Sequence, residues 1–262
     1  MVKEVGVCRL LGTKGPFENS HIIPDAFMRR VSAAPFMQWD GQNKPKKLFT
    51  GWYDKALLSR EGEALIARYD DYIAKILLRA GWTYRKRRPL GKPEKLEDAF
   101  VANDVYCLSP VDTNLVRLFA LSMLWRAAET NNEGFSNVTL RSVLRENLKQ
   151  RILSGDAGHY MEFPVYFTLY DSKFELTKMA ATKFDGHPFF RFFMDGVACY
   201  VGKSQSNLWS RKNHSMMVGA QADRLIAVCI NSESSHHARN DREMMSSLAD
   251  AHGDVFRSFY KQ

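Results

Sequence analysis

An apolar run from Leu115 to Ala128 constrains the fold more than any other feature of the sequence. It reads Leu-Val-Arg-Leu-Phe-Ala-Leu-Ser-Met-Leu-Trp-Arg-Ala-Ala and has the periodicity of a helix. Arg117 and Arg126 interrupt it, and no stretch of the chain reaches the 18 or more apolar residues that a membrane span needs. We therefore expect a buried helix inside a folded domain and no contact with a membrane.

The size and composition of the chain are those of an ordinary globular protein. It has 262 residues, of which 45% are hydrophobic and 25% charged, so one large domain or two small ones can bury a core. The N-terminus carries no signal peptide pattern. The four cysteines are scattered and form no CxxC pair, which favours reduced thiols and a cytoplasmic location.

The chain divides into three predicted parts: a first unit over 1–83, a linker over 84–104 and a second domain over 105–262. Short apolar pairs and turn residues near the N-terminus indicate short strands. A helix is expected from about Lys55 to Arg79, because apolar residues recur there with a period near 3.6. Asp54 is a suitable N-cap for that helix.

The part after residue 105 contains both helical and strand patterns. A helix is expected to start at Ser109-Pro110 and a second to cover 140–153 and stop at Gly155. Asp195-Gly196 between two apolar runs indicates a hairpin. Strands are expected over 163–170, 189–194, 197–201 and 225–230, and a last helix over about 239–260. The predicted class is α+β, with an N-terminal ββα unit followed by a helical and antiparallel-sheet domain.

Basic residues are concentrated in the N-terminal part. The net charge is +8, and residues 1–104 contain 19 lysines and arginines against 13 acidic residues. The residues Arg85, Lys86, Arg87 and Arg88 lie in a proline-containing stretch, which is a solvated linker or an arm that contacts phosphates.

The segment that carries chemistry is Ser20-His21-Ile22-Ile23-Pro24. Asp54 follows His21 by 33 positions, and Glu63 follows Asp54 by nine. This pattern resembles the HNH endonucleases, also called ββα-metal nucleases, in a bacterial branch with an SHIIP motif. The resemblance covers about residues 5–80. It implies a DNA-cutting enzyme of a phage, a mobile element or a defence system.

The resemblance also assigns positions to the cysteines that usually hold a structural zinc ion in these proteins. Cys8 occupies one of these positions, while Leu11, Ser59 and Gly62 occupy the other three. One thiolate cannot hold a structural zinc ion. We therefore expect no structural zinc and a brace made of apolar packing.

The resemblance implies His21 as the general base and Asp54 and Glu63 as ligands of one Mg²⁺ or Mn²⁺ ion. A neutral imidazole suits the deprotonation of water near pH 7. Other interpretations remain open: His21 as a strand-end histidine, Asp54 as a helix cap and Glu63 as a solvent-facing residue. Glu18 and Glu61 are reserve ligands. Ser20 stands where many HNH nucleases carry an acidic ligand.

Three function hypotheses follow. The leading one is a metal-dependent DNA endonuclease. The second is an HNH fold that has lost catalysis and binds nucleic acid or a protein. The third is a subunit of an assembly or homo-oligomer that uses residues 105–262. Two weaker candidates are a metal site at His236, His237 and Asp241 and a nucleic-acid contact in the basic loop with Trp209, Arg211, Lys212 and His214. The phenylalanines Phe189, Phe190, Phe192 and Phe193 are expected in the core or in an interface.

Overall fold

The fold was analysed in a computed structural model of the chain. The structure describes residues 4–28, 36–38, 46–48, 51–83, 86, 88, 90, 92–94, 104–170, 182–183, 189–203 and 213–230, with residues 243, 246, 247, 250 and 253. The predicted α+β class is confirmed, because helices and a six-stranded sheet occur together. No helix in these ranges is long and apolar enough to cross a membrane.

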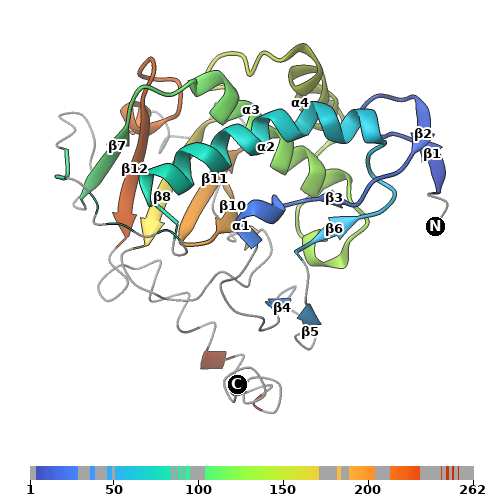
Figure 1. Ribbon diagram of the computed structural model, residues 1–262, viewed down its shortest axis with the longest axis horizontal. Coiled ribbons are helices and arrows are strands. Elements are labelled where there is room, and N and C mark those ends of the chain that lie inside the picture. The colour runs from blue at the N-terminus through green and yellow to red at the C-terminus, as the bar shows by residue number, and fades with distance from the viewer. Residues whose placement is uncertain are drawn as a thin grey trace.

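Within the continuously described ranges, the helical part consists of α-helices and short 3₁₀ turns (Figure 1). The α-helices are α1 (Asp25–Met28), α2 (Arg60–Ala80), α3 (Thr113–Glu129) and α4 (Ser142–Ser154). The 3₁₀ turns cover Glu133–Phe135 and His214–Met216. Gly81 and Gly155 end α2 and α4 with φ values of 71° and 72°. Both glycines adopt the left-handed conformation that commonly ends a helix, as predicted for Gly155.

Helix α3 is the central helix of the molecule. Every residue from Val116 to Ala127 is buried, including Arg117 and Arg126. The helix contacts α2, α4 and strand β11 of the sheet. The prediction of a buried helix from the apolar run is therefore confirmed.

In the described part of the chain, the strands form one large sheet and three two-stranded pairs. The large sheet has the order β7-β12-β8-β11-β10-β9. These strands are β7 (Val105–Leu108), β8 (Val165–Tyr170), β9 (Thr182–Lys183), β10 (Phe189–Met194), β11 (Val197–Gly202) and β12 (Leu225–Ile230). Strands β8 and β12 are parallel, whereas every other pair is antiparallel. The expectation of a purely antiparallel sheet is wrong at this one junction.

The hairpin between β10 and β11 turns at Asp195-Gly196 as predicted. Both residues have positive φ, 48° and 89°, which the tight turns of two-residue hairpins require. Successive β10 side chains face opposite sides of the sheet. Phe190 and Phe192 belong to the main core, while Phe189 and Phe193 belong to a second cluster. All four phenylalanines are buried, as expected for a core strand.

The three small pairs lie in the N-terminal part of the chain. They consist of β1 (Val5–Val7) with β2 (Lys14–Pro16), β3 (Ser20–His21) with β6 (Tyr53–Asp54), and β4 (Phe36–Gln38) with β5 (Lys46–Leu48). Ile22 and Ile23, one of the short apolar pairs from which strands were expected, instead follow β3 and are completely buried. Along the chain, α1, β4 and β5 lie between β3 and β6, and residues 55–59 separate β6 from α2.

Two predicted helix starts are wrong. Helix α2 begins at Arg60 with Ser59 as its N-cap, because Asp54 is paired in β6. The carbonyls of Leu57 and Leu58 accept hydrogen bonds from the N–H groups of Arg9 and Glu18, so residues 57 and 58 lie outside the helix. Helix α3 begins at Thr113, where the N-cap is Asp112 rather than Ser109.

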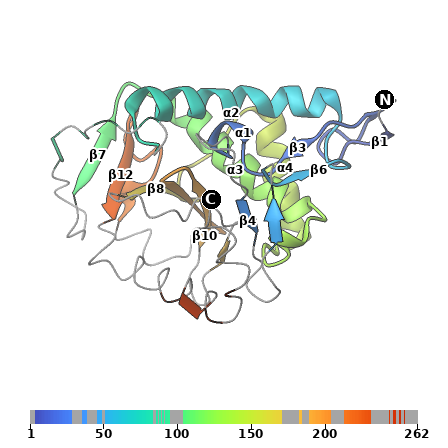
Figure 2. The same cartoon turned by 60° about the horizontal axis from the view of Figure 1, so that its bottom comes forward.

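The main core is continuous across the predicted linker. It includes Cys8, Ile22 and Ile66 from the first predicted unit, and Leu121 and Phe167 from the second. Figure 2 shows α2 lying along one side of the molecule, above α3 and the sheet. Helix α2, which precedes the predicted linker, and helix α3, which follows it, therefore pack against each other in one hydrophobic core. The last predicted helix, 239–260, falls largely outside the described residues.

Candidate active site around His21

His21 ends strand β3 and is half-buried. Its backbone pairs with Tyr53 of β6, and the two rings lie 6.1 Å apart. The side chain of His21 is 27% exposed. The next residue, Ile22, donates its backbone N–H to the carbonyl of Trp52 at 2.9 Å. The imidazole is therefore held on a paired strand and still reached by solvent.

A carboxylate that the sequence analysis did not single out faces this imidazole. Oδ1 of Asp25, in the first turn of α1, lies 3.9 Å from Nε2 of His21. The side chain of Asp25 is 36% exposed. An acid at this distance stabilises a protonated imidazole, the form a general base reaches after it takes a proton.

Asp54 lies next to this strand, but its carboxylate already has partners. Oδ1 accepts the N–H of Ala56 at 2.8 Å. Oδ2 accepts the hydroxyl of Thr130 at 2.7 Å and the N–H of Asn131 at 3.2 Å. Burial raises the pKa of Asp54, but these hydrogen bonds and Arg9 together hold it below its ordinary value. Asp54 is thus an ionised carboxylate that joins β6 to the segment after α3.

Glu63 lies one turn into α2, and its carboxyl group is largely buried beside Ser20. Burial raises the pKa of Glu63 above its ordinary value, against the opposing effects of Arg126 and the Ser20 hydroxyl. Among the described residues, neither Oε2 of Glu63 nor Oγ of Ser20 has a partner with hydrogen-bond geometry. The Ser20 hydroxyl and the Glu63 carboxyl therefore form a buried polar pair next to the His21 strand, close enough to interact but without a well-formed hydrogen bond.

Arg126 of α3 is completely buried and reaches both α2 and β3. Its Nη1 and Nη2 donate to the two oxygens of Asp70, each at 2.9 Å. Nη1 also donates to the backbone carbonyl of His21 at 2.6 Å. The remaining donors contact the carbonyl and hydroxyl of Ser122. The guanidinium of Arg126 therefore connects α3, α2 and β3 at the backbone of His21.

The end of α3 adds further contacts to the same strands. Thr130 and Asn131 bind Asp54, and the side chain of Asn132 donates to the carbonyl of Tyr53 at 3.4 Å. Arg9 of the β1–β2 region donates to the carbonyl of Glu129. The surroundings of His21 thus include residues from both sides of the predicted linker.

The positions assigned to zinc cysteines by the resemblance come together in space. The N–H of Leu11 donates to Sγ of Cys8 at 3.5 Å. A Cβ atom added to Gly62 would lie 2.7 Å from the same sulfur. Ser59 accepts the N–H of Gly62 as the helix cap. A buried thiol packed against a glycine occupies this junction between the β1–β2 turn and α2.

The predicted ligands do not assemble into a ready metal site. Within the described ranges, no three histidine, cysteine, aspartate or glutamate side chains are grouped to hold a metal ion. Both oxygens of Asp54 have donors, and burial favours the neutral form of Glu63. The reserve ligand Glu18 pairs with Arg60 at 3.2 Å, and Glu61 is exposed in the first turn of α2. As arranged, Asp54 and Glu63 do not fit the role of joint Mg²⁺ ligands.

Other predicted site residues lie away from this region or outside the described residues. Lys86 and Arg88 are exposed, while Arg85 and Arg87 are not described. The group His236, His237 and Asp241 and the residues Trp209, Arg211 and Lys212 are likewise not described. His214 is exposed in a 3₁₀ turn.

The sequence alone indicated that Arg126 needs a buried partner, but it did not indicate which residues are its partners. An arginine in an otherwise apolar helix must have a counter-charge when it is buried. Several acids could supply that charge, so the choice of Asp70 needs the packing of α2 on α3. Asp25 could be found as a residue four positions after His21, but its closeness depends on the short helix α1.

No protein-family model, curated protein or solved structure matches this chain.

Proposed function

We propose that this chain is a phosphodiesterase that cuts DNA, with His21 as the general base. The observation that carries the proposal is the half-exposed imidazole at the end of β3, with the carboxylate of Asp25 3.9 Å from Nε2. A base must be open to the water it activates, and a neighbouring acid stabilises the proton it takes. The resemblance to HNH endonucleases supplies the reaction class.

Dependence on Mg²⁺ or Mn²⁺ is part of this proposal. Such an ion would stabilise the charge that develops on the leaving oxygen. Since Asp54 and Glu63 do not fit as a pair, we assign no ligand set. Mg²⁺ commonly retains several waters and needs only one or two protein carboxylates, so titration of the ion is the direct test.

DNA is the proposed partner because of the basic charge. The residues Arg85, Lys86, Arg87 and Arg88 are the proposed phosphate contacts; Lys86 and Arg88 are exposed. If these residues neutralise phosphates, their joint change to alanine lowers DNA affinity and flattens its dependence on salt.

The test is plasmid nicking with Mg²⁺, Mn²⁺ or EDTA, comparing wild type with His21→Ala. The exposed histidine His159, which belongs to no candidate site, supplies the control variant His159→Ala. We expect nicking that needs the metal, disappears in His21→Ala and persists in His159→Ala. Nicking that survives in His21→Ala would reject His21 as the base.

A second candidate function is a DNA-binding or protein-binding module without catalysis. The specific observation in its favour is that both oxygens of Asp54 have structural partners and that burial favours neutral Glu63. Salt-dependent DNA binding without cleavage under any of the metals would support this module over the enzyme.

A further inference from the structure

We propose that Arg126 is a positioning residue for His21, so that the segment after the predicted linker forms part of the catalytic unit. The inference rests on the proposed function, because it concerns how the proposed base is held. Arg126 touches no reacting atom; it acts through the backbone of the residue that does.

The contact geometry supports this role. Nη1 of Arg126 donates to the carbonyl of His21 at 2.6 Å, while both terminal nitrogens hold Asp70 at 2.9 Å. The two bonds to Asp70 fix the plane of the guanidinium relative to α2. The bond to the carbonyl of His21 then fixes the end of β3 relative to that plane. An arginine can make all these bonds at once because its donors form a rigid planar fork.

The ion pair between Arg126 and Asp70 is largely buried, so the loss of either partner would leave an uncompensated charge inside the protein. The side chain of Arg126 is 0% exposed and that of Asp70 is 15% exposed. Burial raises the pKa of the Asp70 carboxyl, and the adjacent Arg126 opposes that rise. Taking an ion pair out of water is unfavourable, and a hydrophobic pair would serve stability as well or better. Stability alone therefore does not explain this ion pair, whereas the positioning of His21 does.

The strand that carries His21 also needs an external support. Strand β3 has only two residues, Ser20 and His21, and it pairs with an equally short β6. A two-stranded pair of this length has little stability of its own. The bond from Arg126 to the carbonyl of His21 fastens the last residue of β3 to a fully buried helix.

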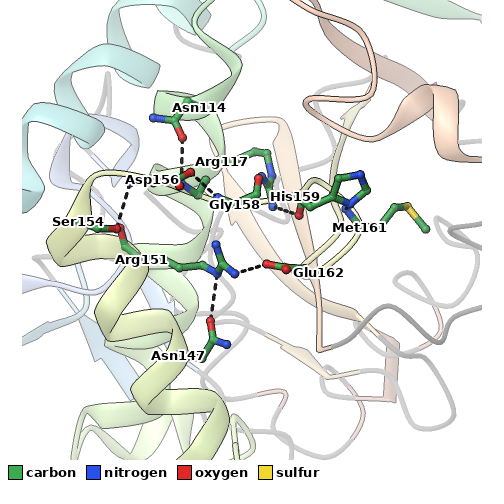
Figure 3. Close-up of polar contacts among 11 residues, drawn as sticks. Asn114, Arg117, Asn147, Arg151, Ser154, Asp156, Gly158, His159, Met161 and Glu162 are labelled. Atoms are coloured by element: carbon green, nitrogen blue, oxygen red, sulfur yellow. Dashed lines mark hydrogen bonds and ion pairs between the residues drawn. The ribbon is translucent and has the colours of Figure 1, made fainter.

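The same helix provides a matched control. Arg117 is also buried in α3, and it donates to the carbonyls of Gly158 and His159 (Figure 3). Burial and the neighbouring Arg151 lower the pKa of Arg117 to about 10, which leaves it cationic at pH 7.5. Arg117 thus shares with Arg126 its burial in α3 and its bonds to backbone carbonyls, but these carbonyls lie in the loop after α4 rather than in β3.

The experiment compares Arg126→Lys with Arg117→Lys in the full chain, at a temperature where circular dichroism shows both to be folded. Lysine keeps the charge but cannot hold Asp70 and His21 together. In DNA cleavage with Mn²⁺, we expect kcat to fall about ten- to a hundredfold in Arg126→Lys with KM changed less than about twofold. Arg117→Lys should keep kcat within about twofold of wild type.

A second measurement does not depend on cleavage. The ring protons of His21 are observed by NMR and assigned with His21→Ala. We expect Arg126→Lys to shift or broaden these signals and Arg117→Lys to leave them in place. If Arg126→Lys does not fold, Asp70→Asn, which keeps the guanidinium but weakens its anchor, takes its place and is expected to have a smaller effect of the same kind.

The outcomes separate the two proposals. Unchanged kcat and unchanged His21 signals in Arg126→Lys would overturn the positioning role, as would equal losses in both arginine variants. If wild type cuts no DNA, the proposed function fails. The NMR comparison then decides whether Arg126 positions His21.

Discussion

At the scale of single residues, the environment of each predicted site residue differs from what its type alone suggests. Asp54 and Glu63 are both carboxylates, yet hydrogen bonds lower the pKa of the first and burial raises that of the second. Cys8 is completely buried, and its sulfur would lie 2.7 Å from a Cβ atom added to Gly62. These environments lead to two predictions.

Gly62→Ala is expected to destabilise the protein, although alanine normally favours a helix by up to about 1 kcal/mol over glycine. The new Cβ would lie 2.7 Å from Sγ of Cys8. That sulfur is buried and accepts the N–H of Leu11, so it cannot move freely. We expect a loss of about 1–3 kcal/mol in urea unfolding, as for other overpacked sites.

The double variant Cys8→Ala/Gly62→Ala checks the cause. Removal of the sulfur relieves the close approach, so the double-mutant cycle should give a coupling of about 1 kcal/mol or more. Simple addition of the two single effects would show that the sulfur is not responsible.

Glu63→Gln is expected to stabilise the protein at pH 7.5. The raised pKa means that the folded chain holds the proton of Glu63 more tightly than the unfolded chain does. The stability contributed by this group is fully present below the unfolded pKa and is lost as the pH rises through the folded pKa. Glutamine avoids that loss, so Tm should exceed that of wild type at pH 7.5 and match it near pH 4.

The control for this prediction is Glu61→Gln, two positions away on α2. The pKa of Glu61 is lowered, mainly by its own backbone N–H and by Ser59, so no gain in Tm is expected at pH 7.5. A fall in Tm for Glu63→Gln at pH 7.5 would mean that Glu63 is ionised and stabilised in the folded chain.

At the scale of elements, the sequence pattern predicted those helices and strands whose position depends on the periodicity of nearby residues. The apolar period placed α2, and the bounds of β10 and β12 match the predicted strands, because side chains there alternate or are buried throughout. The start of α2 was misplaced because Asp54 and Ser59 are both good caps, and only the pairing of β6 decides between them. The parallel junction of β8 with β12 depends on which strands become neighbours, which no local pattern encodes.

Asp54→Ala is expected to destabilise the contact between β6 and the residues that follow α3. The change removes the acceptor for three donors: two backbone N–H groups and the hydroxyl of Thr130. Because the carboxylate is partly exposed, we expect a loss of about 1–2 kcal/mol in urea unfolding at pH 7, without added metal. The lowered pKa of Asp54 means that its contribution is present above the unfolded pKa and is lost as the pH falls through the folded pKa.

Thr130→Val tests the same contact from the other side. The stability losses of Thr130→Val and Asp54→Ala should not simply add, since both variants remove the hydrogen bond between Thr130 and Asp54. A variant Asp54→Ala with wild-type stability but weaker Mn²⁺ binding would return Asp54 to the role of a metal ligand.

At the scale of the whole molecule, residues before and after the predicted linker share one core, and α2 packs on α3. We therefore expect one cooperative unfolding transition. Incorporation of 5-fluorotryptophan allows this to be followed by ¹⁹F NMR at Trp52 and Trp82 on one side and Trp125 on the other, all of them buried. The three signals should disappear at the same urea concentration. Loss of Trp52 before Trp125 would instead indicate two units that unfold separately.

The central claim is that His21 performs chemistry on DNA rather than only completing a strand. The most direct measurement follows one labelled DNA duplex under single-turnover conditions with Mn²⁺, recording both its binding and its cleavage by wild type and by His21→Ala. The account predicts equal affinity for the two proteins, with cleavage by wild type alone. Binding without cleavage by wild type, or equal cleavage by both proteins, would contradict it.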